Sequence, residues 1–384
     1  MLTSRRIYLP PVSLIGPGAL QDLKSDLTDL SYQHALLVTD KDLVEYGVAQ
    51  KVMDVLTAAG VAYTLYDNVQ PNPTTSNVNE GLKVLQEKKC DFILTLGGGS
   101  PQDCGKAIGI LATNGGDIRD YEGIHISKKP SLPIIAVNTT AGTASEVTIN
   151  YVITDEEKQI KMVMVDKNCL VSIAVNDPEL MIGKPASLTA ATGMDALTHA
   201  IEAYVTKGAY RWTDTLALEA IKLIAESLED AVKDGNNIEA RSKMAWGQFV
   251  AGQSFSNAGL GFVHSMAHQL GGVYNMPHGV ANAVLLPHVE RFNIPQCADK
   301  LKDVAAAMGV DTTNMTAQQG AEAAISAIET LSKAVGIPAG LAELGVEKEA
   351  IELMAANALK DVCAGGNPLD VTKEDAIAIY EAAM

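Results

Sequence analysis

The sequence predicts two domains: an α/β domain built on a parallel sheet in residues 1–183, and an all-helical domain in residues 184–384. Between residues 34 and 175, short β-branched runs alternate with helical patterns, which is the rhythm of a parallel sheet covered by helices. After residue 185 the chain becomes rich in Ala, Leu, Met and Glu at helical spacing. With 384 residues, the chain is also longer than one core usually fills.

The predicted sheet begins at residues 34–39, an apolar run followed by a helical pattern over residues 42–59 that ends at Gly60. The same alternation continues to residue 137. Further strands are expected at residues 61–66, 91–96 and 132–137, and further helices at residues 75–88 and from residue 100 onward. A hairpin is expected where the runs 147–154 and 161–165 flank an acidic turn.

The helical domain is predicted from long segments that repeat apolar residues at helical spacing. These segments cover residues 189–203, 213–235, 239–258, 299–308, 317–335 and 371–383. Residues 285–288 are the only extended candidate in this half, and residues 7–10 are strand-like at the start of the chain.

Composition excludes several classes of partner. The net charge is −17 and basic residues form no cluster, which argues against nucleic acids and anionic membranes. The sequence has no apolar run of about 18 residues and no leader-like apolar start, so we expect a cytoplasmic protein. The five cysteines are scattered without a CxxC pair, so a bound metal is expected to have nitrogen and oxygen ligands.

A glycine-rich turn follows the predicted strand 91–96. Residues 97–103 read Gly-Gly-Gly-Ser-Pro-Gln-Asp, with Ser100 as the expected N-cap and Pro101 in the first helical turn. Consecutive glycines let the backbone approach a ligand, and the free N–H groups of a helix start favour an anion such as a pyrophosphate. The turn differs from the GxGxxG fingerprint, so a turn that serves only close packing is the alternative.

Two further features favour a nucleotide in this domain. Residues 138–146 form a polar loop after the predicted strand 132–137, and ligands of parallel sheets gather at the carboxyl ends of strands. Asp40 ends the first predicted strand, where a carboxylate accepts hydrogen bonds from a ribose and repels a 2′-phosphate. Asp40 therefore predicts NAD rather than NADP, with capping of the next helix as the alternative.

Side chains typical of a metal centre are concentrated in the second half. Asp195 and His199 are four apart on a predicted helix, so they share one face. His264 and His268 repeat this spacing, and His278 follows on an apparent loop. Burying an aspartate in a segment as apolar as 189–203 is costly unless the carboxylate is paired or coordinated.

We therefore expect Asp195, His199, His264 and His278 to hold a divalent ion. Three imidazoles and one carboxylate suit Fe²⁺ or Zn²⁺ and suit Ca²⁺ or Mg²⁺ poorly. Such an ion polarises a carbonyl or stabilises an alkoxide. His268, one turn beyond His264, is the candidate catalytic proton-relay group, with packing or support of a ligand as the alternative.

Taken together, these motifs resemble those of the iron-containing (group III) alcohol dehydrogenases, over nearly the whole chain. The matching segments are residues 97–103, 139–146, 177–202 and 264–278. The resemblance implies a Rossmann-like, dehydroquinate synthase-like first domain, Fe²⁺ with Zn²⁺ as the alternative, and NAD(H). It also implies homodimers or larger homo-oligomers, in which residues 6–9 could form an exchanged strand.

The resemblance also implies roles for individual residues, with metal ligands at the four positions already named. It implies nucleotide contacts at Asp40, Asn72, Gly98, Gly99, Ser100, Pro101, Gln102, Asp103, Thr139, Thr140 and Lys161. It implies a substrate pocket that includes Asn150, Phe255, Leu260 and Cys363.

The activity implied is that of an NAD(H)-dependent, metal-dependent alcohol dehydrogenase or aldehyde reductase. Residues 148–158 and 361–368 are most similar to members that reduce lactaldehyde, which predicts the interconversion of lactaldehyde and 1,2-propanediol. Residues 181–186 and 266–272 are equally similar to members that act on 1,3-propanediol or short primary alcohols such as ethanol, so these substrates are the alternative.

Two roles from other classes are weaker alternatives. A metal-dependent lyase of the dehydroquinate synthase type would need several basic residues to hold a phosphate-bearing substrate, and none lie near the metal motifs. A role in which metal and nucleotide only stabilise an assembly is favoured least.

Overall fold

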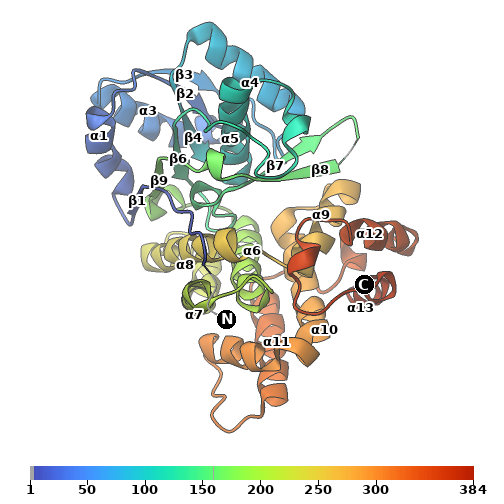
Figure 1. Cartoon of the computed structure of the whole chain (residues 1–384). Coiled ribbons are helices and arrows are strands. Elements are labelled where there is room, and N and C mark those ends of the chain that lie inside the picture. Colours follow the sequence, from blue (N-terminus) through green and yellow to red (C-terminus); the bar gives the residue numbers. More distant parts are fainter. Residues whose placement is uncertain (1–3, 159) are drawn as a thin grey trace. The chain divides into compact units, whose positions relative to one another are not determined.

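The computed structural model describes residues 4–158 and 160–384, and the chain divides into two compact units (Figure 1). Unit 1 comprises residues 1–140 and 144–181, and unit 2 comprises residues 141–143 and 182–384. The change of unit at residue 182 lies close to the expected domain boundary at residue 184. That the short segment 141–143 belongs with unit 2 was not expected from the sequence.

Unit 1 is built on a six-stranded parallel sheet with strand order β1-β9-β6-β4-β2-β3. Its strands are β1 (Val12–Ile15), β2 (His34–Val38), β3 (Ala62–Tyr66), β4 (Phe92–Gly97), β6 (Ile134–Asn138) and β9 (Ile173–Asn176). Because neighbouring strands run in the same direction, the loops after β2, β4 and β6 leave the sheet at one edge.

Helices cover both faces of this sheet (Figure 1). They are α1 (Ala19–Asp29), α2 (Lys41–Glu45), α3 (Val48–Ala58), α4 (Thr75–Lys88) and α5 (Gly99–Asn114). Alternate residues of β2, β4 and β6 form one core with α1 and α3, whereas α5 packs on the opposite face. The prediction of one helix over residues 42–59 was wrong, because Gly47 adopts a φ of 75° and separates α2 from α3.

A smaller sheet completes unit 1, with order β5-β8-β7. Its strands are β5 (Gly123–Ile124), β7 (Asn150–Asp155) and β8 (Ile160–Val165), and the antiparallel pairing of β7 with β8 confirms the expected hairpin. Short 3-10 helices lie at Ile118–Tyr121, Ser145–Val147, Lys167–Cys169 and Pro178–Leu180. The strand expected at residues 7–10 is absent; within the described residues, the first strand begins at Val12.

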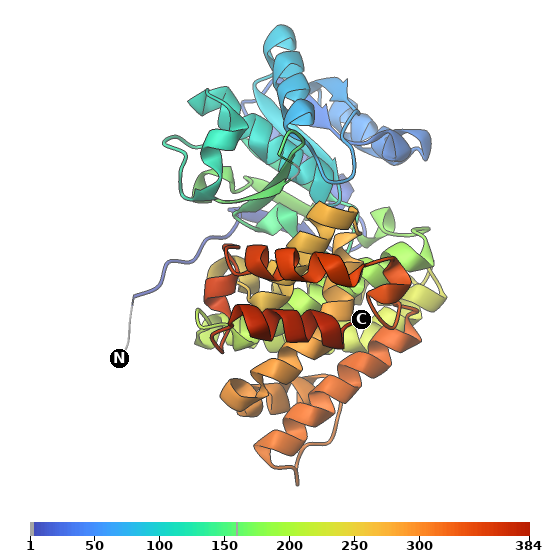
Figure 2. The ribbon, with the colours of Figure 1, turned by 90° about the vertical axis from the view of Figure 1, so that its right-hand side faces the viewer.

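Every regular element described in unit 2 is helical, as predicted. The helices are α6 (Ala186–Val205), α7 (Arg211–Lys233), α8 (Ile238–Ala258), α9 (Phe262–Tyr274), α10 (His278–Ala307), α11 (Ala317–Ala334), α12 (Ile351–Ala358) and α13 (Lys373–Ala382), with 3-10 turns at Ala342–Leu344, Lys348–Ala350 and Ala364–Gly366. Helix α6 packs against α7, α8 and α10, and α12 lies beside α13 (Figure 2). Residues 193–205 of α6 are buried on all sides.

Helix α10 accounts for two predictions that were wrong. Residues 285–288 are not extended but lie within α10, and His278 is not on a loop but is its first residue. Packing against α6, α9 and α11 keeps the chain helical around Pro287, whereas α10 is kinked at Cys297 (φ −135°, ψ 26°), two residues after Pro295. Among the described residues, no helix has both the length and the apolar character that crossing a membrane requires.

Candidate functional site

Four side chains predicted as metal ligands come together in unit 2. Asp195 and His199 project from one face of α6, His264 from α9 and His278 from the first turn of α10. Each residue offers one ligand atom, and the four atoms lie within 4.8 Å of one another. The imidazole rings of His199 and His264 stack at 4.5 Å between centroids, and those of His264 and His278 lie at 5.2 Å.

Close packing of two helices places His278 beside Asp195. A Cβ on Gly279 would lie 2.2 Å from the carbonyl oxygen of Ala191 and 3.3 Å from Cβ of Asp195. The start of α10 can therefore contact α6 at this distance only because residue 279 is glycine. As a result, Nε2 of His278 lies 3.7 Å from Oδ1 of Asp195.

The donor set fits a divalent cation. The amide nitrogen of Asn282 lies 2.7 Å from Oδ1 of Asp195 and 3.1 Å from Nε2 of both His264 and His278. An amide nitrogen has two hydrogens, so it cannot satisfy three acceptors at once. Several lone pairs thus converge in a buried space, which a cation satisfies better than a hydrogen-bond donor.

The protonation of the histidines also suits coordination. Burial lowers the pKa of His199, and burial together with the neighbouring His199 and His278 holds the pKa of His264 well below its usual value. Both imidazoles are therefore neutral at physiological pH, the form that binds a metal ion.

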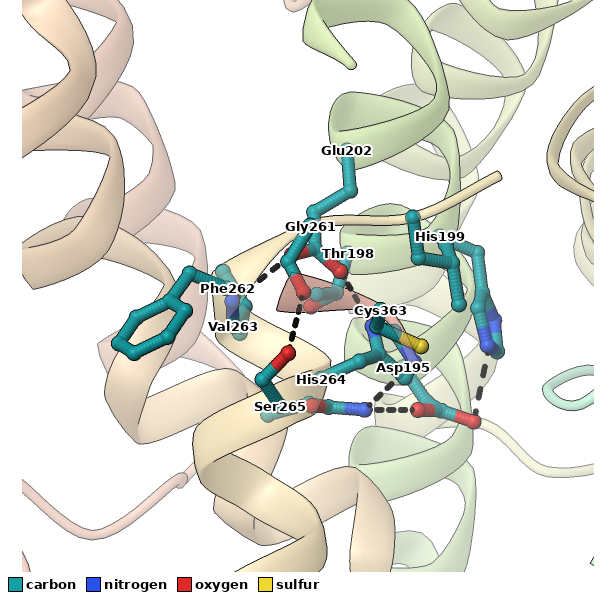
Figure 3. Close-up of polar contacts among 12 residues, drawn as sticks. Asp195, Thr198, His199, Glu202, Gly261, Phe262, Val263, His264, Ser265 and Cys363 are labelled. Atoms are coloured by element: carbon teal, nitrogen blue, oxygen red, sulfur yellow. Dashed lines mark hydrogen bonds and ion pairs between the residues drawn. The ribbon is translucent and has the colours of Figure 1, made fainter. Parts of the chain in front are cut away.

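Glu202 is a buried partner of the cluster that the sequence analysis did not identify. Figure 3 shows it reaching from α6 to the start of α9. Its Oε2 contacts Nδ1 of His264, and its Oε1 accepts a hydrogen bond of 2.8 Å from the N–H of Val263. A carboxylate on Nδ1 leaves Nε2 of His264 as the ligand atom. Burial, reinforced by Glu290, raises the pKa of Glu202 well above its usual value.

His268 has a carboxylate partner as well. Its Nδ1 lies 2.8 Å from Oδ2 of Asp361, and its ring stacks on that of His278 at 5.5 Å. Burial would raise the pKa of Asp361, but the charge and hydrogen bond of His268 hold it below its usual value. The N–H of Cys363 donates to Oδ1 of Asp361 at 2.9 Å, which places this predicted substrate residue next to His268.

The other two pocket residues predicted in unit 2 differ in their positions. The ring of Phe255 stacks on that of His199 at 4.2 Å, so it borders the metal cluster. Leu260 lies in the loop between α8 and α9, where its carbonyl oxygen accepts a hydrogen bond of 3.0 Å from Thr206. Contact of either side chain with a substrate stays a prediction.

The glycine-rich turn of unit 1 joins β4 to α5, and it meets the polar loop that follows β6. Cβ atoms on Gly97 and Gly98 would lie 2.6 Å from Cγ of Pro101 and 2.9 Å from Oγ1 of Thr140. The N–H of Thr139 donates to the carbonyl of Gly97 at 3.1 Å. Close backbone packing and an accessible helix start therefore occur together at this turn.

The N-cap of helix α5 lies two residues earlier than predicted. Gly98 is the N-cap in an extended conformation and Gly99 is the first helical residue, so the prediction of Ser100 as N-cap was wrong. Ser100 and Pro101 both lie in the first turn. The flexible glycine backbone lets the helix start without a side-chain cap, which leaves its N–H groups available for an anion.

Two residues predicted to contact the nucleotide form hydrogen bonds with the protein itself. Gln102 donates to the carbonyl of Gly97 at 3.0 Å. Asp103 accepts from the hydroxyl of Ser145 at 2.7 Å and from the N–H of Val152 at 2.9 Å. These bonds hold the turn and its neighbouring segments in place, and direct contact with a nucleotide stays a prediction.

Lys106, which the sequence analysis did not identify, anchors the same region. Its side chain is fully buried on α5. Nζ donates to the carbonyl oxygens of Ser145, Thr148 and Asn150 at 2.6, 2.9 and 2.8 Å. All three ammonium hydrogens are thereby used. A lysine within the apolar run of α5 was the available signal, since a buried charge needs partners.

The remaining predicted nucleotide and substrate residues of unit 1 lie around these loops. Asp40 caps α2 by accepting a hydrogen bond of 2.9 Å from the N–H of Leu43, and its contact with a ribose stays a prediction. Nζ of Lys161 donates to Oδ1 of Asn72 at 2.8 Å, so these two predicted nucleotide contacts are neighbours. The side-chain oxygen of Asn150 has no hydrogen-bond partner among the described residues.

Comparison with known proteins identifies one family over both units. Residues 10–178 match the model of the iron-containing alcohol dehydrogenases, and residues 189–384 match the model of the C-terminal part of the Fe-containing alcohol dehydrogenase family. The two matches leave only short segments uncovered.

Individual relatives match over their full length. Lactaldehyde reductase of Escherichia coli K12 is 50% identical over 382 residues, which are 99% of this chain and 100% of that protein. A solved 1,3-propanediol oxidoreductase is 49% identical with a TM-score of 0.98 and full coverage of both chains. A sulfoacetaldehyde reductase of Bifidobacterium kashiwanohense, solved in complex with NAD⁺, is 29% identical with a TM-score of 0.89, covering 100% of this chain and 99% of that one.

Proposed function

The chain belongs to the iron-containing alcohol dehydrogenase family, and we propose that it interconverts lactaldehyde and 1,2-propanediol with NAD(H) and Fe²⁺. It is an alcohol dehydrogenase and aldehyde reductase. The observation that carries the metal assignment is the convergence of Asp195, His199, His264 and His278 within 4.8 Å. Zn²⁺ suits the same donor atoms and is the alternative ion.

The cofactors supply the bond-changing chemistry: a divalent ion polarises the substrate oxygen, and NAD(H) donates or accepts the hydride. The four ligands hold their lone pairs in one buried place. Glu202 keeps the Nδ1 proton of His264 in position, so Nε2 is the atom that binds. In unit 1, the glycine turn offers the N–H groups at the start of α5 to the pyrophosphate.

His268 is the proposed proton-relay group. Asp361 accepts a hydrogen bond from Nδ1 at 2.8 Å and so fixes the tautomer with a proton on that atom. Nε2 is then left to accept a proton from an alcohol, or to return one to an alkoxide, directly or through water. Because Asp361 acts through His268, it is a positioning residue.

The side chains around the metal cluster favour a small substrate. Phe255 covers one face of His199, and the thiol of Cys363 lies within 4.8 Å of a carboxylate oxygen of Asp361. These side chains are mostly apolar, and they leave the metal ligands and His268 as the polar groups for a carbonyl or hydroxyl. Lactaldehyde, a three-carbon 2-hydroxyaldehyde, is small enough to suit such surroundings.

Substrate choice is tested by a panel of aldehydes. Under anaerobic conditions, kcat/KM is measured from NADH oxidation with lactaldehyde, propanal and 3-hydroxypropanal. We expect lactaldehyde to give the highest value. A strong preference for 3-hydroxypropanal would instead assign the chain to 1,3-propanediol metabolism, the alternative that the 49% identical 1,3-propanediol oxidoreductase favours.

We further propose that the enzyme works in the cytoplasm as a homodimer or larger homo-oligomer. All five cysteines are unpaired, as is usual in a reducing compartment. β1 is an edge strand, and exposed apolar side chains of Ile7, Leu9 and Val12 accompany this edge, which favours pairing with another chain. Light scattering coupled to size-exclusion chromatography tests this: a monomer at working concentration would contradict it.

A further inference from the structure

We propose that His268, Asp361 and Cys363 form a second cation site in unit 2, which binds a thiophilic divalent ion such as Zn²⁺. Each residue offers one ligand atom, and the three atoms lie within 4.8 Å of one another. Among the described residues, this is the one such group besides the cluster around Asp195.

The local backbone brings the three donors together. Asp361 and Cys363 follow α12, and the N–H of Cys363 donates to Oδ1 of Asp361 at 2.9 Å, so a tight turn places thiol and carboxylate side by side. His268 approaches from α9, with Nδ1 at 2.8 Å from Oδ2 of Asp361. This contact is a hydrogen bond through the Nδ1 proton of His268, so an ion that binds both Nδ1 and Oδ2 must displace that proton.

The donor set selects the ion. One thiolate, one imidazole and one carboxylate are ligands that Zn²⁺ accepts, and three protein ligands leave a fourth position for water. The first cluster has no sulfur, so the two sites differ in softness, and the sulfur-containing site favours Zn²⁺ over Fe²⁺. The side chain of Asp361 is 8% exposed, and Cys363 as a whole residue is half-buried.

Binding at this site has a cost and a consequence. Two protons must move: the thiol of Cys363 releases its proton to solvent, and the proton on Nδ1 of His268 moves to Nε2 or to solvent. The site is therefore weak and fills only when the ion is in excess. An ion bound to His268 removes that imidazole from proton exchange, so excess Zn²⁺ is expected to inhibit aldehyde reduction.

Cobalt provides a direct test, because only a sulfur ligand gives the near-ultraviolet charge-transfer absorption of a Co²⁺ thiolate. The iron-loaded enzyme is titrated anaerobically with Co²⁺. We expect this absorption to appear and to saturate, and to be absent in Cys363→Ser. Cys297→Ser, which changes a buried cysteine of the same unit, serves as the control and should keep the absorption.

Two results would overturn the proposal. Either the wild-type enzyme shows no Co²⁺–thiolate absorption, or the Cys363→Ser variant retains it. Co²⁺ that merely replaces iron cannot mimic the signal, since the first cluster has only nitrogen and oxygen donors. Circular dichroism establishes that each variant folds. The Asp361→Asn variant is a second test, because it removes the carboxylate and keeps the thiol. We expect it to weaken Co²⁺ binding by about tenfold or more. Unchanged affinity would exclude Asp361 as a ligand.

Discussion

The candidate metal cluster of unit 2 and the glycine-rich turn of unit 1 differ in what they offer a ligand. In the cluster, four side chains point at one another and their donor atoms lie within 4.8 Å. At the turn, the backbone of residues 97–99 and the start of α5 are left available, whereas Gln102 and Asp103 bond to the protein itself. One site is made of side chains and the other mainly of main chain.

Because of this difference, the side chains of the metal motif bind the ligand themselves, whereas those of the glycine-rich motif need not. In the cluster, the residues of the motif are themselves the ligands, because the metal needs those particular donor atoms. At the turn, the polar side chains of the motif hold in place the backbone that binds the anion. These side chains can therefore be required for folding as well as for ligand contact. Substitutions should therefore separate the two sites: those in the cluster remove metal, and those near the turn change nucleotide binding or stability.

The largest effect is expected from Asp195→Ala. It removes the only carboxylate among the four ligands and leaves three imidazoles in a buried space. We expect the bound iron to fall below about a tenth of the wild-type content and kcat/KM to fall about a thousandfold. Elemental analysis and NADH oxidation measure both. Glu322→Ala, on the exposed side of α11, is the control, and full iron retention in Asp195→Ala would contradict the ligand set.

Lys106→Met should act on unit 1 alone. The substitution leaves the carbonyls of Ser145, Thr148 and Asn150 without their common donor in a buried site, so we expect a loss of about 3 kcal/mol in the free energy of unfolding. KM for NADH should rise while iron content stays constant. Lys83→Met, 75% exposed on α4, should change stability by less than about 0.5 kcal/mol. If Lys106→Met lost iron as Asp195→Ala does, the two sites could not be distinguished by substitution.

Glu202→Gln tests the support of a ligand rather than a ligand. Glutamine has the same shape and can still accept from the N–H of Val263, but it then places an amide N–H group instead of an acceptor oxygen against Nδ1 of His264. We expect iron affinity to fall about 10- to 100-fold with NADH affinity unchanged. A competition titration with a chelator measures it, and Glu239→Gln, 83% exposed at the start of α8, provides the comparison. Unchanged iron affinity would make Glu202 a packing residue.

The smallest effect is expected from Asp40→Asn. Asparagine is an equally good N-cap for α2, so the bond to the N–H of Leu43 survives while the negative charge is lost. If the charge repels a 2′-phosphate, kcat/KM for NADPH relative to NADH should rise about tenfold. Asp42→Asn, in the first turn of the same helix, is the control. An unchanged cofactor ratio would leave Asp40 as a cap only.

Much of the fold could be predicted because its elements follow local patterns. Local sequence patterns predict these elements: apolar runs mark β2, β4 and β6, and helical spacing of apolar residues marks α7, α8 and α11. The errors occur where tertiary packing overrides a local signal. Residues 285–288 and His278 belong to α10 although Pro287 interrupts the pattern, and Gly47 divides a segment that periodicity alone treats as one helix.

The partners of the metal ligands were harder to predict than the ligands. Glu202 lies seven residues beyond Asp195 on α6, and Asn282 lies four beyond His278 on α10, so helical spacing could have revealed both. Asp361 had no such signal, because it is 93 residues from His268 and meets it only through the fold. Contacts at long sequence separation are set by packing, which a local pattern does not encode.

The central claim is that the four converging side chains hold one catalytic divalent ion. The most direct measurement is elemental analysis of anaerobically purified wild-type enzyme, paired with NADH oxidation by lactaldehyde before and after chelation. We predict about one iron per chain, loss of turnover in proportion to iron removed, and recovery when Fe²⁺ is restored. Full turnover by protein that contains no metal would contradict the account.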